Sequence, residues 1–228
     1  MPDYKLDAAT AAATMIIAGQ TIGLGGGQTI AYLAEALAAS PEMMDALTVT
    51  SSSFDTTVLL YKKGFRVVAP ALISRLDLYF DGCDVFDKQL NALKSGGGIH
   101  VTEKILAGAA NRFVLLGDAS KYQHVLDPKY PIALEILPQA LEIVRRQLQI
   151  RYPDARFVQR VSTSKTGAVV SDNGNLLADL HFDAFPALPE LDIQLNMIPG
   201  IAGHSLFYNM AHQAIIAGES GVQYIDPA

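Results

Sequence analysis

The sequence predicts an α/β protein with a doubly wound, mostly parallel sheet and a second, smaller α+β domain inserted into it. Three observations support this prediction. Short apolar strands alternate with helices over the first half of the chain, as a parallel sheet with helices on both faces requires. A glycine-rich segment, residues 23–27, joins the first strand to the helix after it. The order of the elements then changes near Pro128.

The elements expected before residue 128 follow from hydrophobic periodicity. Short apolar runs predict strands, and apolar residues that recur every three or four positions predict helices. We expect helices at 7–18, from 30 to 38, through 59–60 and at 102–110, and strands at 21–24, 46–50, 65–68, 76–80 and 112–116. This alternation predicts the doubly wound sheet.

The segment from 128 to 206 has a different pattern. Its expected order is a strand at 132–136, a helix at 139–149, strands at 156–161, 167–170 and 175–180, a helix at 188–197 and a strand at 203–207. Asn173-Gly174 is a strong turn signal and predicts a hairpin between the two strands that flank it. Apart from the short strand at 167–170, this is the order β-α-β-β-α-β, which is typical of a ferredoxin-like domain. A closing strand at 214–218 would return to the first domain, so we expect one domain at 1–127 plus 207–228 and another at 128–206.

Composition excludes several classes of protein. The 228 residues include 17 Lys and Arg against 23 Asp and Glu, a net charge of −6, which disfavours nucleic acid and anionic membranes as partners. Half of the residues are hydrophobic, which is too many for a disordered chain. A single cysteine, Cys83, cannot form an internal disulfide, so the cytoplasm is favoured. The first five residues contain an acid, and no apolar run approaches the roughly 18 residues of a membrane span, so neither export nor anchoring is expected.

The glycine segment is the first candidate site. In Gly23-x-Gly25-x-Gly27 the backbone can approach an anion closely, and the helix that follows presents free N–H groups. The spacing differs from the G-x-G-x-x-G of dinucleotide-binding proteins, and no GK[ST] follows. A phosphate monoester fits this pattern, although glycines at such a position also serve simply as a tight turn.

A second candidate site combines three carboxylates with a lysine. Asp81 and Asp84 follow a strand, Lys94 precedes another glycine turn, and Glu103 opens a helix, all in the crevice where doubly wound sheets bind ligands. Such groups can move protons and stabilise developing negative charge. Each residue also has a structural explanation as a turn, cap or solvated residue. The lysine argues against a dedicated metal ion, and the five histidines lack ligand-like spacing, although His100 is close enough to Glu103 to line the same crevice.

The order of these motifs resembles ribose-5-phosphate isomerase type A over nearly the whole chain. The resemblance depends on eight segments in sequence: 23–29, 51–53, 81–84, 94–98, 102–104, 118–121, 171–175 and 198–200. The fold that it implies, a Rossmann-like domain with an inserted ferredoxin-like domain, agrees with the fold expected from periodicity. It also implies interconversion of ribose 5-phosphate and ribulose 5-phosphate through a cis-enediolate, without metal or organic cofactor.

The resemblance also assigns roles to residues. Glu103 would be the base, Asp81 would assist ring opening and hydroxyl proton transfer, Asp84 would orient sugar hydroxyls, and Lys94 with the amides of Gly96 and Gly97 would stabilise the enediolate. The remaining expected substrate-binding residues are Gly26, Gly27, Gln28 and Thr29 for the phosphate, together with Gly82, Cys83, Ser95 and Lys121. A homodimer or homotetramer is implied as well.

Two departures from the family pattern concern the phosphate loop. Gly26 and Gln28 stand where the family has threonine and serine, so two hydroxyl donors are lost and only Thr29 retains one. Three functions therefore stay open: the family's own isomerase, a related isomerase for another sugar, and a sugar-phosphate sensor without activity. Retention of Glu103 favours an enzyme, since a sensor needs no base. Cys83, between two carboxylates, is expected to be an apolar filler with a raised thiol pKa.

Overall fold

The computed structural model describes residues 3–164 and 166–228, so Met1 and Pro2 of the N-terminal segment considered above lie outside it. Its largest sheet has seven strands, all parallel except for the edge strand β14. The order across this sheet is β14 (Gly221–Ile225), β13 (Gln213–Gly218), β7 (Ala110–Asp118), β4 (Leu76–Asp81), β1 (Thr21–Leu24), β2 (Thr48–Ser51) and β3 (Arg66–Val67). The strand order reverses between β1 and β4, as in a doubly wound Rossmann-like sheet.

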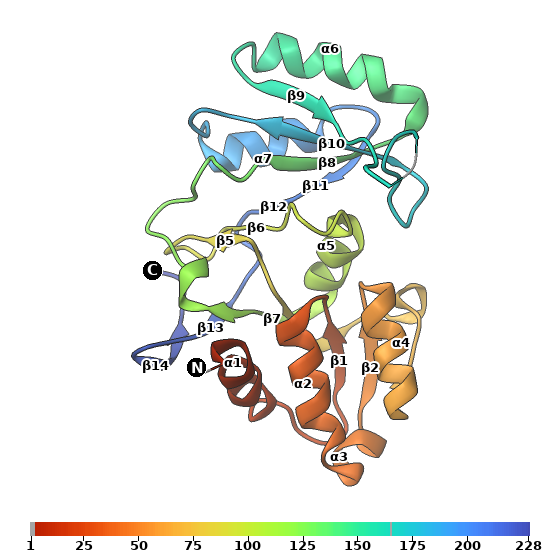
Figure 1. Ribbon diagram of the computed structural model, residues 1–228, viewed down its shortest axis with the longest axis vertical. Helices are drawn as coiled ribbons and strands as arrows, with labels where there is room; N and C mark the ends of the chain where they lie inside the picture. Colours follow the sequence, from red (N-terminus) through yellow and green to blue (C-terminus); the bar gives the residue numbers. More distant parts are fainter. Residues whose placement is uncertain (1–2, 165) are drawn as a thin grey trace.

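The central strands of this sheet are buried on both faces, whereas the edge strands β14 and β3 are largely exposed. Along β4, β7 and β13, consecutive side chains enter two different cores, which is the period of two expected for a strand. In the described part of the chain, helices cover this sheet (Figure 1): α1 (Tyr4–Ala13), α2 (Gln28–Ala38), α3 (Pro41–Ala46), α4 (Phe54–Lys63) and α5 (His100–Ala109). Short 3₁₀ turns lie at η1 (Pro70–Leu72), η2 (Ala119–Lys121) and η3 (Pro138–Ala140). The expected α/β class is confirmed.

A four-stranded sheet lies at the other end of the molecule (Figure 1). It is formed by β11 (Ile201–His204), β8 (Ile132–Ile136), β10 (Leu176–His181) and β9 (Arg156–Gln159), in that order. The helices α6 (Leu141–Arg151) and α7 (Leu188–Asn196) share one core with this sheet. The chain order β-α-β-β-α-β is the ferredoxin-like order that the sequence predicts. The assignment of residues 128–206 to a separate domain stays a prediction.

A three-stranded sheet lies between these two parts of the molecule (Figure 1). Its strands are β12 (Leu206–Phe207), β6 (Ala92–Leu93) and β5 (Val85–Phe86). Because side chains alternate along a strand, Leu93 and Leu206 enter the core of the four-stranded sheet, whereas Ala92 and Phe207 enter a core of the seven-stranded sheet. The small sheet therefore joins the two larger ones.

Several expected elements are wrong in their limits. The first helix begins at Tyr4 because the Asp3 side chain caps it, and it ends at Ala13 rather than 18. Ser40 and Pro41 start α3, a helix that we did not expect, and it delays the second strand to Thr48. No strand forms at 167–170, where isolated bridges replace the expected pairing. The strand expected at 203–207 is divided between two sheets, and β14 was not expected at all.

Candidate active site

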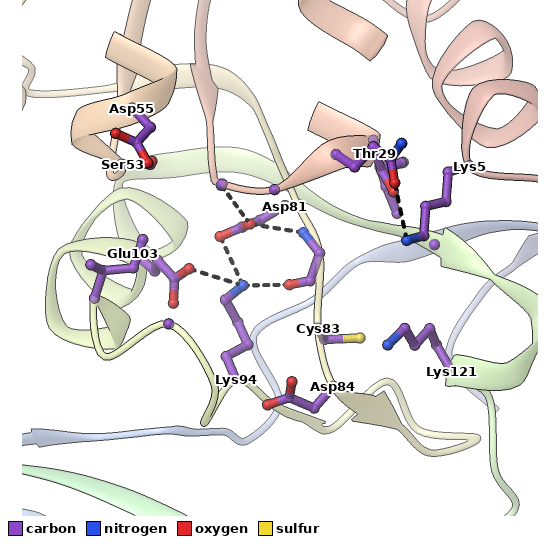
Figure 2. A pocket seen from close by; sticks show the side chains of 18 of the residues that line it. Lys5, Thr29, Ser53, Asp55, Asp81, Cys83, Asp84, Lys94, Glu103 and Lys121 are labelled. Carbon is purple, nitrogen blue, oxygen red and sulfur yellow. Dashed lines mark hydrogen bonds and ion pairs between the residues drawn. The ribbon is translucent and has the colours of Figure 1, made fainter. Parts of the chain in front are cut away.

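A cleft of about 670 Å³ opens where β1 and β4 end (Figure 2). These are the strands between which the strand order reverses, and ligands of doubly wound sheets bind at such a point. Figure 2 shows Lys5 and Lys121 at one end of the cleft and Ser53 and Asp55 at the other. Segments that are far apart in the sequence thus line one cavity.

Lys94 lies at the centre of the cleft. Its ammonium group is 2.9 Å from an Asp81 carboxylate oxygen and 3.2 Å from Glu103 Oε1, and it also donates to the carbonyl of Gly82. The side chain is almost fully buried, which alone would lower its pKa, but the two carboxylates raise the pKa above its ordinary value. Lys94 is therefore a fixed positive charge whose own side chain is shielded from solvent.

Glu103 lies in the first turn of α5, which begins at His100. Burial raises the pKa of its carboxyl group to about 8; the Lys94 ammonium opposes this shift and the Asp81 carboxylate adds to it. A carboxyl group with a pKa near neutrality can both accept and return a proton under physiological conditions. This is the property that a proton-transfer base needs.

Asp81 connects several residues of the site through hydrogen bonds and an ion pair. One carboxylate oxygen accepts from the backbone N–H groups of Gly26, at 3.3 Å, and Gly82, at 2.8 Å, and the other accepts from the Tyr79 hydroxyl, at 2.6 Å, and from Lys94. A Cβ atom on Gly25 would stand 1.8 Å from this carboxylate. The loop after β1 can thus approach Asp81 because residue 25 has no side chain.

The serines at 51–53 stabilise the surroundings of Asp81. Ser52 shares a hydrogen bond of 3.0 Å with the Tyr79 hydroxyl, and Ser51 donates to the carbonyl of Gly25 at 3.3 Å. Ser53 caps α4 through the Thr56 N–H. Tyr79 and Ser52 were missed as site residues, although Tyr79 precedes Asp81 by two positions on β4, where side chains share a face.

The cationic end of the cleft contains the glycine loop. Gly26, Gly27, Gln28 and Thr29 line it, as expected, and Gly27 caps α2 without a side chain, so first-turn N–H groups stay available to an anion. The Gln28 amide, however, is bound to other side chains: its nitrogen donates to the Tyr32 hydroxyl at 2.9 Å, and its oxygen accepts from Lys5 at 3.4 Å. Lys5 was missed, because no sequence signal connects the first helix with this loop.

The other expected site residues are only partly in the cleft. Gly82, Cys83, Asp84, Gly97 and Lys121 line it. Ser95 and Gly96 do not: their N–H groups donate to the Asp84 carboxylate at 2.6 and 3.1 Å, and the Ser95 hydroxyl bonds to Pro131 and Ser205. Their contribution is to hold Asp84.

Cys83 has the raised pKa that the sequence predicts, but for a different reason. Burial raises the pKa of its thiol to about 12, and the flanking carboxylates add less than burial does. The thiol is therefore protonated at neutral pH.

The loop that contains Lys94 is fixed from the four-stranded sheet. Arg160 forms a bidentate ion pair with Asp179 and donates to the Ser95 carbonyl at 2.5 Å. Gly98 has φ of +69°, and a Cβ there would lie 2.6 Å from the Leu177 side chain. Neither Arg160 nor its contact with residue 95 was expected, because the two positions are far apart in sequence.

His100 does not line the cleft, although it is close to Glu103 in sequence; it lies in the core, the kind of position expected for a histidine without ligand-like spacing. It is fully buried, and burial lowers its pKa to about 4. Within residues 3–164 and 166–228, no group of three or more His, Cys, Asp or Glu side chains could hold a metal ion. None of the helices described is long and apolar enough to cross a membrane.

This fold and this cleft define an α/β protein with a buried carboxylate–lysine site beside a glycine loop at a helix N-terminus. The family model for ribose 5-phosphate isomerase A (phosphoriboisomerase A) matches residues 48–221. A relative from Methanosarcina acetivorans, named ribose-5-phosphate isomerase A, is 35% identical over 223 residues, covering 97% of this chain and 93% of its own. The chain belongs to the ribose 5-phosphate isomerase A family.

Solved structures show the same relationship. Ribose 5-phosphate isomerase A from Methanocaldococcus jannaschii matches with a TM-score of 0.89 and 31% identity over 97% of both chains. A D-ribose-5-phosphate isomerase in complex with phospho-erythronic acid matches with a TM-score of 0.91 and 28% identity, over 99% of this chain and 100% of that one.

Proposed function

We propose that this protein is a ribose-5-phosphate isomerase, an aldose–ketose isomerase that interconverts D-ribose 5-phosphate and D-ribulose 5-phosphate in the non-oxidative branch of the pentose phosphate pathway. Membership of the family supports the substrate and the reaction. One observation carries the mechanism: a buried ammonium group, Lys94, lies between the carboxylates of Asp81 and Glu103 on the cleft floor.

Glu103 is the base in this proposal. Its carboxylate removes the proton from C2 of the open-chain aldose, the electron pair forms the C1–C2 double bond, and the carbonyl oxygen at C1 becomes an oxyanion. A proton then moves from the C2 hydroxyl to the C1 oxygen, a transfer that Asp81 assists, and the cis-enediolate collapses to a ketone at C2 as Glu103 returns its proton to C1. No electrons or atoms enter or leave. A pKa of about 8 suits both proton transfers.

Lys94 and the N–H of Gly97 stabilise the enediolate oxygens. A proton next to a carbonyl is removed at a useful rate when fixed donors meet the developing oxyanion, and a buried ammonium is such a donor. Asp84, held by the amides of Ser95 and Gly96, orients the sugar hydroxyls. Asp81 holds Lys94 and remains our candidate for the proton transfer in ring opening.

The phosphate lies at the cationic end of the cleft. The support for this placement is the free first turn of α2 together with the ammonium groups of Lys5 and Lys121, which line the same cavity. These two lysines offset the loss of hydroxyl donors at Gly26 and Gln28.

The sugar phosphate is the small-molecule partner, and no metal or organic cofactor takes part in our proposal. We also propose a homodimer or homotetramer, which the family resemblance supports, and a cytoplasmic location, which the single cysteine supports.

The test is conversion of ribose 5-phosphate by the purified protein in deuterated water with excess chelator. We expect metal-independent turnover with deuterium incorporated into ribulose 5-phosphate. Glu103→Gln should abolish turnover and leave the circular dichroism spectrum unchanged. Glu142→Gln, an exposed change on α6, is the matched control and should keep full activity.

Other results would favour the alternatives. Substantial turnover by Glu103→Gln would contradict the mechanism. If the wild-type protein does not convert ribose 5-phosphate but converts another aldose phosphate, the altered loop at Gly26 and Gln28 has changed the sugar. Ligand-induced stabilisation without proton exchange into any aldose phosphate would identify a sensor.

A further inference from the structure

The turn at 171–174, which precedes β10 of the four-stranded sheet, reaches the cleft. Asp172, in this turn, lines the cavity together with residues from the part of the molecule that contains the seven-stranded sheet. The turn is well defined: the Ser171 N–H bonds to the Asn175 carbonyl at 2.8 Å, and Gly174 adopts φ of +81°. A turn of the part built on the four-stranded sheet thus reaches the cleft at the strand ends of the seven-stranded sheet.

A buried carboxyl group holds this turn in place. Glu135 lies on β8 with no exposed surface, and its Oε1 accepts from the side-chain amides of Asn173, at 3.0 Å, and Asn175, at 2.7 Å. A buried carboxyl group is unfavourable unless it is bonded, so these contacts stabilise one position of the turn. Asn173 and Asn175 flank the turn glycine, and Asn173 follows Asp172 directly.

The Asp172 carboxylate itself is available to a ligand. Within the described part of the chain, no hydrogen bond or ion pair engages it, and it is exposed at the wall of the cleft. A carboxylate repels a phosphate but accepts hydrogen bonds from hydroxyl groups. The chemistry that suits Asp172 is therefore the hydroxyl-bearing carbon chain and not the phosphate.

We infer that Asp172 binds hydroxyl groups of the substrate's carbon chain and that Glu135 is its positioning residue. This inference rests on the proposed function, because it names a contact that the same sugar phosphate would make. It gives the ferredoxin-like part of the molecule a direct share in substrate recognition.

The first experiment measures binding rather than turnover. Ribitol 5-phosphate has the hydroxyl groups and the phosphate but no carbonyl, so it cannot be isomerised, and inorganic phosphate has no hydroxyl chain. For Asp172→Asn, calorimetry should show about tenfold weaker binding of ribitol 5-phosphate and no weaker binding of inorganic phosphate. Asp183→Asn, an exposed carboxylate of the same sheet region outside the cleft, should change neither.

The inference is overturned if Asp172→Asn binds ribitol 5-phosphate as wild type does, or if it loses affinity for both ligands equally. Failure of the proposed function gives a different result. In that case the wild-type protein does not isomerise ribose 5-phosphate, whatever Asp172→Asn does to ribitol 5-phosphate binding.

The second experiment tests the positioning role of Glu135. Glu135→Leu removes the acceptor of both amides and should raise KM for ribose 5-phosphate about tenfold with kcat within twofold of wild type. Glu135→Gln keeps an acceptor oxygen and should restore KM. Asn173→Ala breaks one contact from the exposed side, should raise KM about threefold, and decides the question if Glu135→Leu does not fold. A wild-type KM in Asn173→Ala, or equal KM values for the Leu and Gln variants, overturns the assignment.

Discussion

Replacing Gly25 by alanine tests the arrangement around Asp81. The added Cβ would lie 1.8 Å from one carboxylate oxygen, 2.4 Å from the other and 1.9 Å from the carbon between them. Ordinary contact begins at 3.4 Å, so loop and carboxylate must separate by about 1.6 Å. A shift of that size breaks hydrogen bonds of 2.6 to 3.3 Å, which are the bonds that Asp81 accepts.

The expected loss follows from those bonds. A hydrogen bond to a charged group contributes about 1.5–3 kcal/mol, so losing two of them destabilises the protein by about 3–6 kcal/mol. For a chain of this length, 1 kcal/mol lowers Tm by about 2–4 °C, so we expect Tm to fall by about 6–24 °C. Because Asp81 also holds Lys94, we expect kcat/KM to fall at least about a hundredfold, which corresponds to about 2.7 kcal/mol.

The assays are thermal unfolding by circular dichroism and ribose 5-phosphate isomerisation. Gly26→Ala is the matched control for stability, because a Cβ there meets Ser53 at 3.4 Å and Ile99 at 3.8 Å, which is ordinary contact. It should lose less than about 1 kcal/mol. A Gly25→Ala protein with wild-type Tm and activity would refute the claim that Asp81 requires glycine at residue 25.

Three further predictions concern other groups of the site. Since Glu103 must be ionised to act as a base and its pKa is raised to about 8, kcat/KM should fall about tenfold per pH unit below pH 8 and level off above it; a flat profile from pH 6 to 9 would contradict this. Since burial raises the Cys83 pKa to about 12, iodoacetamide at neutral pH should inactivate the enzyme slowly, and rapid inactivation that substrate prevents would show a reactive thiolate. Arg160→Met, which removes the bond to the Ser95 carbonyl and the ion pair with Asp179, should lower the free energy of unfolding in urea by about 2 kcal/mol, whereas Arg145→Met, at an exposed ion pair, should lower it by less than about 1 kcal/mol; equal losses would argue against the role of Arg160.

The parts of the fold that could be predicted are those with strong periodicity. The alternation of strands and helices up to Leu116 gave the parallel sheet, and the later β-α-β-β-α-β order gave the four-stranded sheet. The three-stranded sheet could not be predicted, because each of its strands has two residues and a period of two is not visible in so short a run. The strand expected at 167–170 was apolar enough, but β10 is already paired on both sides by β8 and β9.

The residues of the candidate site also fall into those that could be predicted from the sequence and those that could not. Asp81, Lys94 and Glu103 could be found because each follows or opens a regular element whose end faces the crevice. Lys5 and Arg160 could not be found, because they reach the site through contacts between segments that are far apart in sequence. In the proposed mechanism the proton transfers depend on the first group of residues, and the second group helps to position the loops around them.

The three-stranded sheet has a consequence for how the protein can move. Lys94 follows β6 directly, and β6 is held between β5 and β12, whose side chains are shared by both large cores. Any hinge rotation of one half of the molecule against the other would have to carry β6 and its lysine with it. We therefore expect substrate to enter and leave through movements of side chains and loops at the cleft mouth, and we expect the strands around the ammonium group to keep their positions. In amide hydrogen exchange, β6 and β12 should exchange as slowly as the central strands β1 and β4, despite their shortness.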